Sequence, residues 1–166
     1  MWCICGFISK NKCSSDVILE MNKAIKHRGK DDEGYVFGEI NNIESYSGED
    51  SQDGIKTKYK LLNNSKIGIF ALGFRRLSIL DLSEKGHQPM ISEKGNIITY
   101  NGEVYNYKEI REELEGVGFQ FKSNADTEVL LKAYEYFGLD FIKKLDGMFA
   151  FCIADIEKKQ VIFFFF

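Results

Sequence analysis

The sequence predicts a domain of the α+β class, because stretches with strand composition and stretches with helical periodicity alternate along the whole chain. Hydrophobic residues make up 44% and charged residues 28% of the 166 residues, which is the balance of a globular domain. A chain of this length can bury a core of its own. We therefore expect one domain in which hairpins and helices are interleaved, without internal repeats.

In the N-terminal half, three stretches have the apolar composition of strands, at residues 3–9, 34–37 and 67–72. Between the first two, Ile18, Met21 and Ile25 recur at helical spacing, which predicts a helix that ends at about residue 26. We expect one of the polar residues 14–16 to cap its first turn.

A long polar stretch, residues 39–65, separates the second of these strands from the third. It is rich in Asn, Ser, Asp, Glu and Lys and shows little periodicity, so it offers few side chains to bury. We expect a mobile surface insertion that can be shortened without unfolding the domain.

The C-terminal half predicts three more strands, at residues 96–100, 148–155 and from 160 onward, with a turn at 156–159. Two helices are expected between the first and second of these strands, at residues 106–114 and 127–136, followed by a helical turn at 140–145. Asn106 is placed to cap the first of these helices, and Gly138 to end the second.

The last predicted strand ends in four consecutive phenylalanines, and residues 161–166 contain neither a charged residue nor a proline. Such a segment pairs readily with other chains when it lies at the edge of a sheet. We therefore expect it to cause self-association or to be covered by a partner chain.

Charge and hydropathy exclude several classes of function. The formal net charge is -3 and no basic run is present, so nucleic acid is not an expected partner. No apolar run approaches the ~20 residues of a membrane-spanning helix, and the N-terminus lacks the features of a signal peptide. We expect no membrane contact, a cytoplasmic location and reduced cysteines.

The four cysteines are Cys3, Cys5, Cys13 and Cys152. Cys3 and Cys5 alternate along the first predicted strand, so both side chains point to one face. With His27 or His87 they could bind zinc, but the spacing matches no common zinc pattern, and we expect no metal site. Cys5 and Cys152 are better explained as small apolar side chains buried in strands.

Five segments carry motifs in a fixed order, at residues 73–83, 86–90, 100–107, 123–129 and 145–151. They read GFRRLSILDLS, GHQPM, YNGEVYNY, SNADTEV and LDGMFAF. In this order and spacing the chain strongly resembles the N-terminal glutaminase domain of the class II glutamine amidotransferases, and most closely that of the glutamine-dependent asparagine synthetases.

The resemblance implies a four-layer αββα sandwich of the N-terminal-nucleophile hydrolase type over residues 1–166. It also implies that this glutaminase domain is incomplete at its C-terminus and that the synthetase domain is absent. The glutaminase domain needs no cofactor, since ATP and magnesium serve only the synthetase domain. Its inherited reaction is hydrolysis of glutamine to glutamate and ammonia, which supplies asparagine formation.

The N-terminus departs from the family at its nucleophile. The family begins Met-Cys-Gly-Ile-x-Gly-Phe, whereas this chain begins MWCICGF, so Trp2 occupies the position of the nucleophilic cysteine. An indole has no thiol, and a large second residue blocks removal of Met1, which leaves no adjacent free amine as base. Cys3 is a poor substitute, because it lies one residue too late and points to the opposite face of the strand from residue 2.

The other parts of the site are present by resemblance. Asn101 and Gly102 would form the oxyanion hole through a side-chain amide and a backbone N–H. Arg76 would bind the α-carboxylate of glutamine, and Asp126, with Glu103 less directly, would receive the ammonium group. Each position also has a structural explanation: Asn101-Gly102 is a hairpin-turn signal, Asp126 a good helix N-cap, and Arg76 a candidate for a surface ion pair.

Two further positions depart from the family, since Lys30 replaces a proline and Phe74 replaces a histidine. His87 is the remaining candidate base, and we interpret it as a loop residue that shapes the pocket wall.

The sequence thus predicts a glutaminase domain of an asparagine-synthetase-like protein that is weak or inactive because of Trp2. Its ligand would be glutamine, and its partner a separate synthetase chain or a second copy. The alternatives are a non-catalytic glutamine-binding or regulatory subunit and a truncated inactive relic.

Overall fold

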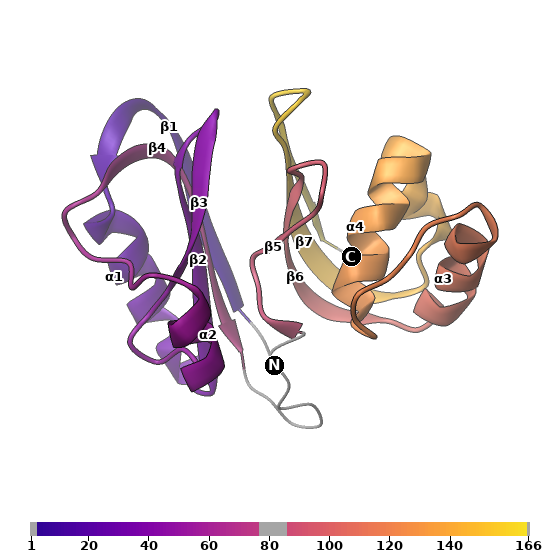
Figure 1. The fold of residues 1–166 in the computed structure, drawn as a ribbon, viewed down its shortest axis with the longest axis horizontal. Coiled ribbons are helices and arrows are strands. Elements are labelled where there is room, and N and C mark those ends of the chain that lie inside the picture. The colour runs from indigo at the N-terminus through magenta and orange to yellow at the C-terminus, as the bar shows by residue number, and fades with distance from the viewer. Residues whose placement is uncertain (1–2, 77–85, 166) are drawn as a thin grey trace. The chain divides into compact units, whose positions relative to one another are not determined.

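The computed structural model describes residues 3–76 and 86–165, and the chain forms two compact units, Met1–Pro89 and Met90–Phe166. Each unit contains one four-stranded antiparallel sheet with helices packed against it (Figure 1). Strands and helices therefore occur together in both units, as the α+β class requires.

The sheet of the first unit has the strand order β1-β4-β2-β3. Its strands are β1 (Cys3–Ser14), β2 (Asp32–Glu39), β3 (Asn42–Ser47) and β4 (Ile67–Arg76). Its helices are α1 (Asp16–Ala24), the 3₁₀ helix η1 (Lys26–Arg28) and α2 (Asp53–Lys58). Helix α1 packs on β1 and β4, so it covers one face of this sheet.

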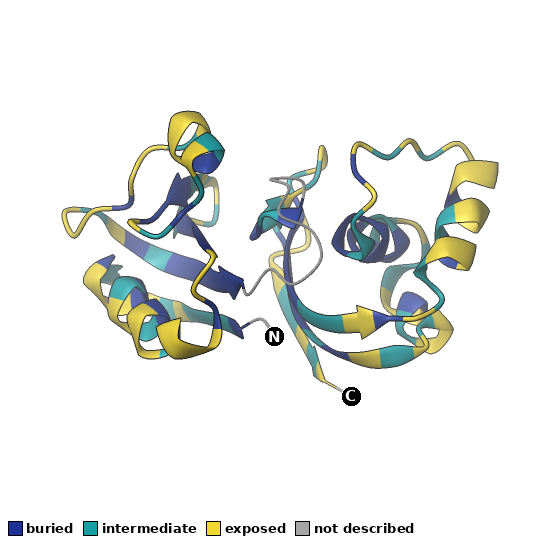
Figure 2. Cartoon of the chain, turned by 90° about the horizontal axis from the view of Figure 1, so that it is seen from below, coloured by how far each residue is buried: buried dark blue, intermediate teal, exposed yellow. Residues whose placement is uncertain are grey.

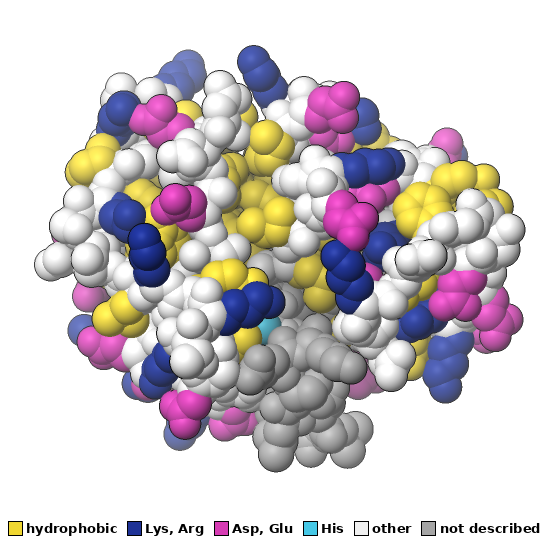
Figure 3. Space-filling view, in the orientation of Figure 1, with side chains coloured by type: hydrophobic (Ala, Val, Ile, Leu, Met, Phe, Trp, Pro, Cys, Tyr) yellow, Lys and Arg dark blue, Asp and Glu magenta, His cyan; other side chains and the backbone are white. Residues whose placement is uncertain are grey.

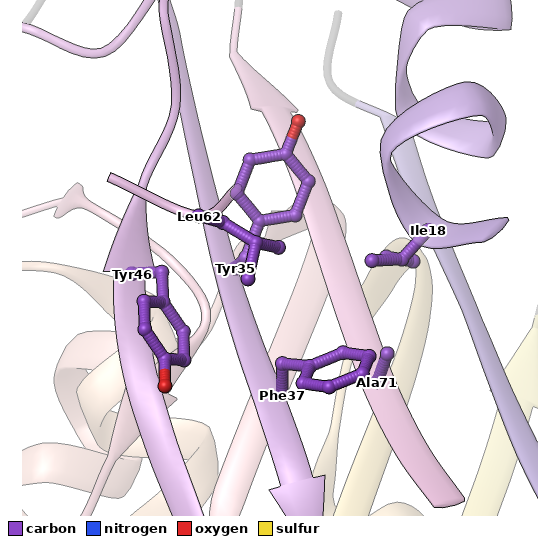
Figure 4. Close-up of a cluster of buried hydrophobic side chains, with 6 residues drawn as sticks. All are labelled: Ile18, Tyr35, Phe37, Tyr46, Leu62 and Ala71. Atoms are coloured by element: carbon purple, nitrogen blue, oxygen red, sulfur yellow. The ribbon is translucent and has the colours of Figure 1, made fainter. Parts of the chain in front are cut away.

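A cluster of six buried side chains forms a core in the first unit: Ile18, Tyr35, Phe37, Tyr46, Leu62 and Ala71 (Figure 4). Tyr35 and Phe37 are two residues apart on β2 and therefore share one face of the sheet. Phe37 lies opposite Ala71 of β4. Ile18, the first residue of the predicted apolar face of α1, is completely buried, so this shared face is the one that α1 covers.

Residues 39–65 are not the surface insertion that the sequence predicts. They contain β3 and α2, and Tyr46, Ile55 and Leu62 are each at most 3% exposed. Strand β3 pairs with β2 along its whole length. The expectation was wrong because a few well-spaced apolar residues anchor a segment whose average composition is polar. Its mobility stays a prediction.

The sheet of the second unit has the strand order β5-β6-β7-β8. Its strands are β5 (Met90–Ile91), β6 (Ile97–Val104), β7 (Gly147–Asp155) and β8 (Gln160–Phe165). Its helices are α3 (Tyr107–Gly116), α4 (Asp126–Phe137) and the 3₁₀ helix η3 (Gly138–Lys144). Helix α4 packs on β6, and α3 packs on α4. Figure 2 shows the central strands mostly buried, whereas the helices carry exposed residues along one side.

Aromatic rings fill the space between η3 and the sheet of the second unit. The ring of Phe151 lies 5.4 Å from that of Phe141, between centroids, and 5.6 Å from that of Phe164 on β8. Phe149 stacks on both Phe151 and Phe164. The odd-numbered positions of β7 thus face the helices, as strand alternation requires.

Strand β8 is the last strand of its sheet among the described residues, and it alternates between packed and exposed rings. Phe164 joins the aromatic core, whereas Phe163 and Phe165 are 67% and 85% exposed. Phe163 and Phe165 therefore form an apolar edge, whereas the sequence suggested that all the phenylalanines of this strand would be exposed. Self-association through this edge stays a prediction.

Two helix ends differ in how well the sequence predicts them. Gly138 ends α4 with a positive φ of 60°, as expected for a glycine in this position. Asn106 occupies the N-cap position of α3, as expected, but its side chain makes no capping hydrogen bond. Its side-chain N–H₂ donates to the carbonyl of Lys144 at 2.8 Å, and its side-chain oxygen accepts from the N–H of Asp146 at 3.0 Å. Asn106 therefore ties the start of α3 to the segment before β7.

The surface offers neither a membrane span nor a field of one sign. No helix among the described residues is long and apolar enough to cross a membrane. On the face shown in Figure 3, Lys and Arg side chains are interspersed with Asp and Glu side chains.

Candidate functional site

Two adjacent arginines at the end of β4 point to opposite faces of the first sheet. The guanidinium of Arg75 donates to the carbonyl of Asn22 in α1, so it lies on the helix-covered face. It also pairs with Glu33 at 2.7 Å and with Asp50 at 2.6 Å. Arg75 is thus fully used by the fold, and by strand alternation Arg76 projects from the other face.

Arg76 is 3% exposed, so the surface ion pair that the sequence left open is wrong. Its carbonyl accepts the N–H of Asp31 at 2.9 Å. On the face opposite α1 its neighbour across the sheet is Asp32 of β2. Gly86 lies against its guanidinium, since a Cβ on Gly86 would come within 3.0 Å of Nη2. The guanidinium of Arg76 is therefore enclosed on this face, and its binding of a carboxylate stays a prediction.

His87 is held on the same face. Its Nδ1 lies 2.8 Å from a carboxylate oxygen of Asp32, and its ring stacks on that of Tyr59 at 5.9 Å between centroids. The ring covers Gly34 of β2, where a Cβ would come within 2.6 Å of it. His87 is therefore a loop residue, as the sequence predicts, and it is packed into the first unit. Its role in shaping a pocket wall stays a prediction.

In the second unit, Asn101 and Gly102 lie inside β6, so the hairpin-turn explanation is wrong. They pair with Ala150 and Phe149 of β7. Gly102 has a φ of 145° and no room for a side chain, because a Cβ would lie 2.2 Å from the carbonyl oxygen of Met148. This close approach explains why glycine is needed at position 102.

Asn101 and Glu103 share the face of β6 opposite α4, because side chains alternate along a strand and the preceding residue, Tyr100, points to α4. The Tyr100 hydroxyl donates to Asp126 at the start of α4 at 2.8 Å. Asn101 is partly buried and Glu103 is exposed. A polar amide and a carboxylate thus stand two residues apart on one face of this strand.

Asp126 is the first residue of α4 and does not have the N-cap position, which Ala125 occupies. Its carboxylate accepts from the hydroxyl of Tyr100 and, at 2.8 Å, from the N–H of Thr127. Burial raises the pKa of Asp126, and the negative charge of Glu103 adds to this effect. The structure therefore joins Tyr100 and Asp126 by a hydrogen bond within the second unit, whereas Glu103 lies on the opposite face of β6 and acts on Asp126 only through its charge.

The start of α4 depends instead on Glu128, which sequence reasoning missed. Its carboxylate accepts from the N–H of Lys122 at 2.9 Å and from the N–H and hydroxyl of Ser123 at 2.8 and 2.7 Å. Burial alone would raise the pKa of Glu128, but these donors lower it below the ordinary value. The position of an acidic residue in the first turn of a predicted helix was the available signal.

Neither of the first two cysteines has the properties of a nucleophile. Cys5 faces α1, where its thiol lies 3.7 Å from the side-chain oxygen of Asn22, and burial raises its pKa to about 12. Cys3 is buried and, two residues away on β1, points to the same helix-covered face. Trp2, the residue at the family's nucleophile position, lies outside the described residues.

The described residues contain no group of three or more His, Cys, Asp or Glu side chains that could hold a metal ion. All four cysteines are free thiols, and burial raises the pKa of Cys152 to about 12.

Comparison with known sequences identifies relatives over most of the chain. The model of a family described as the glutamine amidotransferase domain matches residues 61–164, which include all the candidate site residues except those at the N-terminus. A putative glutamine-hydrolysing asparagine synthetase 2 of Methanocaldococcus jannaschii is 40% identical over 96% of this chain. The glutamine-hydrolysing asparagine synthetase 1 of Bacillus subtilis is 36% identical over 90% of it. The chain spans 29% and 20% of the lengths of these two relatives.

Solved structures share the fold at lower sequence identity. The glutamine phosphoribosylpyrophosphate amidotransferase of B. subtilis, in complex with ADP and GMP, matches 94% of this chain with a TM-score of 0.73 and 20% identity. This chain covers 35% of that structure. The likeness confirms the predicted fold class, an α+β sandwich of the N-terminal-nucleophile type.

Proposed function

Because the chain belongs to the glutamine amidotransferase domain family, in its class II branch, we propose that it is the glutamine-binding domain of an asparagine-synthetase-like protein. The observation that carries the proposal is the family match across Arg76, Asn101 and Asp126, joined to relatives whose names describe them as glutamine-hydrolysing. In such a protein the released ammonia would serve asparagine formation, and ATP and magnesium would act in the synthetase part.

Recognition of glutamine would use opposite charges at its amino-acid end. The guanidinium of Arg76, buried on the face opposite α1, would bind the α-carboxylate with two parallel hydrogen bonds. Asp126 would receive the α-ammonium group, with Glu103 adding negative charge nearby. Tyr100 supports this role because its hydroxyl fixes one oxygen of Asp126.

Hydrolysis of the side-chain amide would pass through an oxyanion. The amide of Asn101 and the N–H of Gly102 would stabilise it, and the positive φ of Gly102 supports a backbone geometry that a larger residue could not adopt. Trp2 supplies no thiol at the family's nucleophile position, and the thiol of Cys5 stays protonated at neutral pH. We therefore propose that this chain binds glutamine with little or no hydrolysis.

A second candidate is a regulatory subunit whose output is glutamine binding itself. The retained clamp residues, together with the missing thiol, favour it over an inactive relic. A relic would bind no glutamine and would lack a cooperative thermal transition. Calorimetric titration with glutamine and a melting curve separate these two candidates.

The test of the catalytic proposal restores the family's N-terminus with Trp2→Cys and Cys3→Gly. We expect the double variant to lose Met1 and to release ammonia from glutamine, and intact-mass analysis checks the processing. In that background Asn101→Ala should lower turnover by about 10²–10³, because one oxyanion donor is lost. A correctly processed double variant without activity, or an Asn101→Ala variant as active as its parent, would contradict the proposed machinery.

A further inference from the structure

The carboxylate of Asp32 stands where it could compete for Arg76. The two residues are direct partners across β2 and β4 and share the face opposite α1. Side chains in such a pair start about 5 Å apart at Cβ, so a carboxylate and a guanidinium reach each other easily. Asp32 is completely buried, and a buried carboxylate requires a partner.

Both oxygens of Asp32 already have donors. Gln52 donates its backbone N–H to Oδ1 at 3.1 Å, and the ring of His87 lies 2.8 Å from Oδ2. The imidazole is itself fixed between Tyr59 and Gly34. The ring of His87 therefore holds Oδ2 of Asp32, which could otherwise turn toward Arg76.

The segment that carries His87 also contacts Arg76. Gly86 lies so close to the guanidinium that a Cβ there would be within 3.0 Å of Nη2. His87 thus anchors, through Asp32, a piece of backbone that limits where the guanidinium can go.

We propose that His87 is a positioning residue for the carboxylate clamp: it engages Asp32 and so keeps the Arg76 guanidinium oriented for the carboxylate of an amino-acid ligand. This inference rests on the proposed function, because the ligand is taken to be glutamine. Loss of His87 lets Asp32 pair with Arg76, which closes the clamp on an internal carboxylate.

The test measures glutamine affinity by calorimetry for four chains: the unmodified chain, His87→Ala, Asp32→Asn with His87→Ala, and His27→Ala. We expect His87→Ala to weaken binding about tenfold, the size of a lost charge-assisted interaction. The added Asp32→Asn should restore affinity to within about threefold, because the competing charge is gone. His27 is the other histidine of the chain and is exposed, so its removal should have no effect.

Rescue separates positioning from structural damage, since a disordered site would not recover on a second substitution. Unchanged affinity in His87→Ala, or a loss that Asp32→Asn does not restore, overturns the inference. Should the unmodified chain bind no glutamine, the proposed function fails, and the inference is then decided without ligand. The ¹⁵Nε resonance of Arg76, assigned with Arg76→Lys, should move in His87→Ala and return in the double variant. A resonance that stays in place overturns the positioning role.

Discussion

The two units stabilise the helix-covered faces of their sheets by different means. In the first unit, Glu33 and Arg75 form a pair with 3% and 4% side-chain exposure, and Asn22 and Tyr35 donate to the same carboxylate. In the second unit, the corresponding space near η3 is filled by the rings of Phe141 and Phe151 and their neighbours. The first unit thus adds complete pairing of buried charges to its apolar core, whereas the second fills this space with apolar volume.

This difference predicts which substitutions should destabilise each unit most. A buried ion pair contributes little net stability over an apolar replacement, but loss of one partner leaves an uncompensated charge. An aromatic core loses stability in proportion to the atoms removed and the cavity left. Substitutions in the two units test these two consequences separately.

Glu33→Gln should destabilise the protein by about 3–5 kcal/mol, because Arg75, Asn22 and Tyr35 all lose the buried carboxylate that they share. Asp50 still pairs with Arg75 in this variant, so the guanidinium keeps one counterion. Lys12→Ala is the matched control, since it removes one partner of the Lys12–Glu39 pair, whose side chains are 65% and 50% exposed. The control should change stability by less than about 1 kcal/mol. Urea unfolding measures the loss of stability in both variants. Equal losses in Glu33→Gln and Lys12→Ala would show that burial of the ion pair does not matter.

Phe151→Ala should cost about 3–5 kcal/mol through a cavity among the stacked rings. Phe163→Ala, on the neighbouring strand but 67% exposed, should change stability by less than about 0.5 kcal/mol. Urea unfolding measures the loss of stability in both variants. A loss from Phe163→Ala as large as that from Phe151→Ala would show that the stacked rings are not a packed core.

Ile55→Ala should cost about 2–5 kcal/mol, because Ile55 is 1% exposed although it lies in the polar segment 39–65. Leu61→Ala in the same segment removes a side chain that is 51% exposed and should have little effect. Thermal unfolding compares the two. If both variants melt with the parent, residues 39–65 are a dispensable insertion after all.

Asp126→Asn should raise stability slightly, because burial raises the pKa of the native carboxylate and thus penalises its ionised form. The native state then holds the proton more tightly than the unfolded state, so stability falls as the pH rises from about 3.9 toward the native pKa. The gain should therefore be absent in acid and present at neutral pH. Melting curves of Asp126→Asn and of the unmodified chain across that pH range check the sign of the change in stability. A variant that melts below the unmodified chain at neutral pH would refute the prediction.

The strands and helices of the second unit are the part of the fold that the sequence predicts best. Residues 148–154 form a continuous apolar run, and the helix at 127–136 is periodic and ended by Gly138, so local pattern and tertiary packing agree. The first unit is harder because its network joins Asn22, Glu33, Asp50 and Arg75, which are far apart in the sequence. Pairing of that kind is decided by strand register, which no single segment specifies.

The candidate site shows the same limit. The resemblance names Arg76, and its motif includes Arg75 beside it, but only the register shows that these residues serve opposite faces. The sequence likewise offers Asn101-Gly102 as a turn, and the pairing with β7 places both inside a strand. The role of Asp32 beside His87 could not be predicted, because the two residues are 55 positions apart.

The most direct test of the central claim is ammonia release from glutamine by the unmodified chain, measured beside the Trp2→Cys, Cys3→Gly variant. Intact-mass analysis of both samples first establishes the N-terminus. We predict release at the background of a heat-killed control for the unmodified chain, because loss of a nucleophile costs on the order of 10⁶ in rate. The double variant should release ammonia at a rate well above that of the heat-killed control. Ammonia release by the unmodified chain at the rate of the double variant would contradict the claim that Trp2 disables the site.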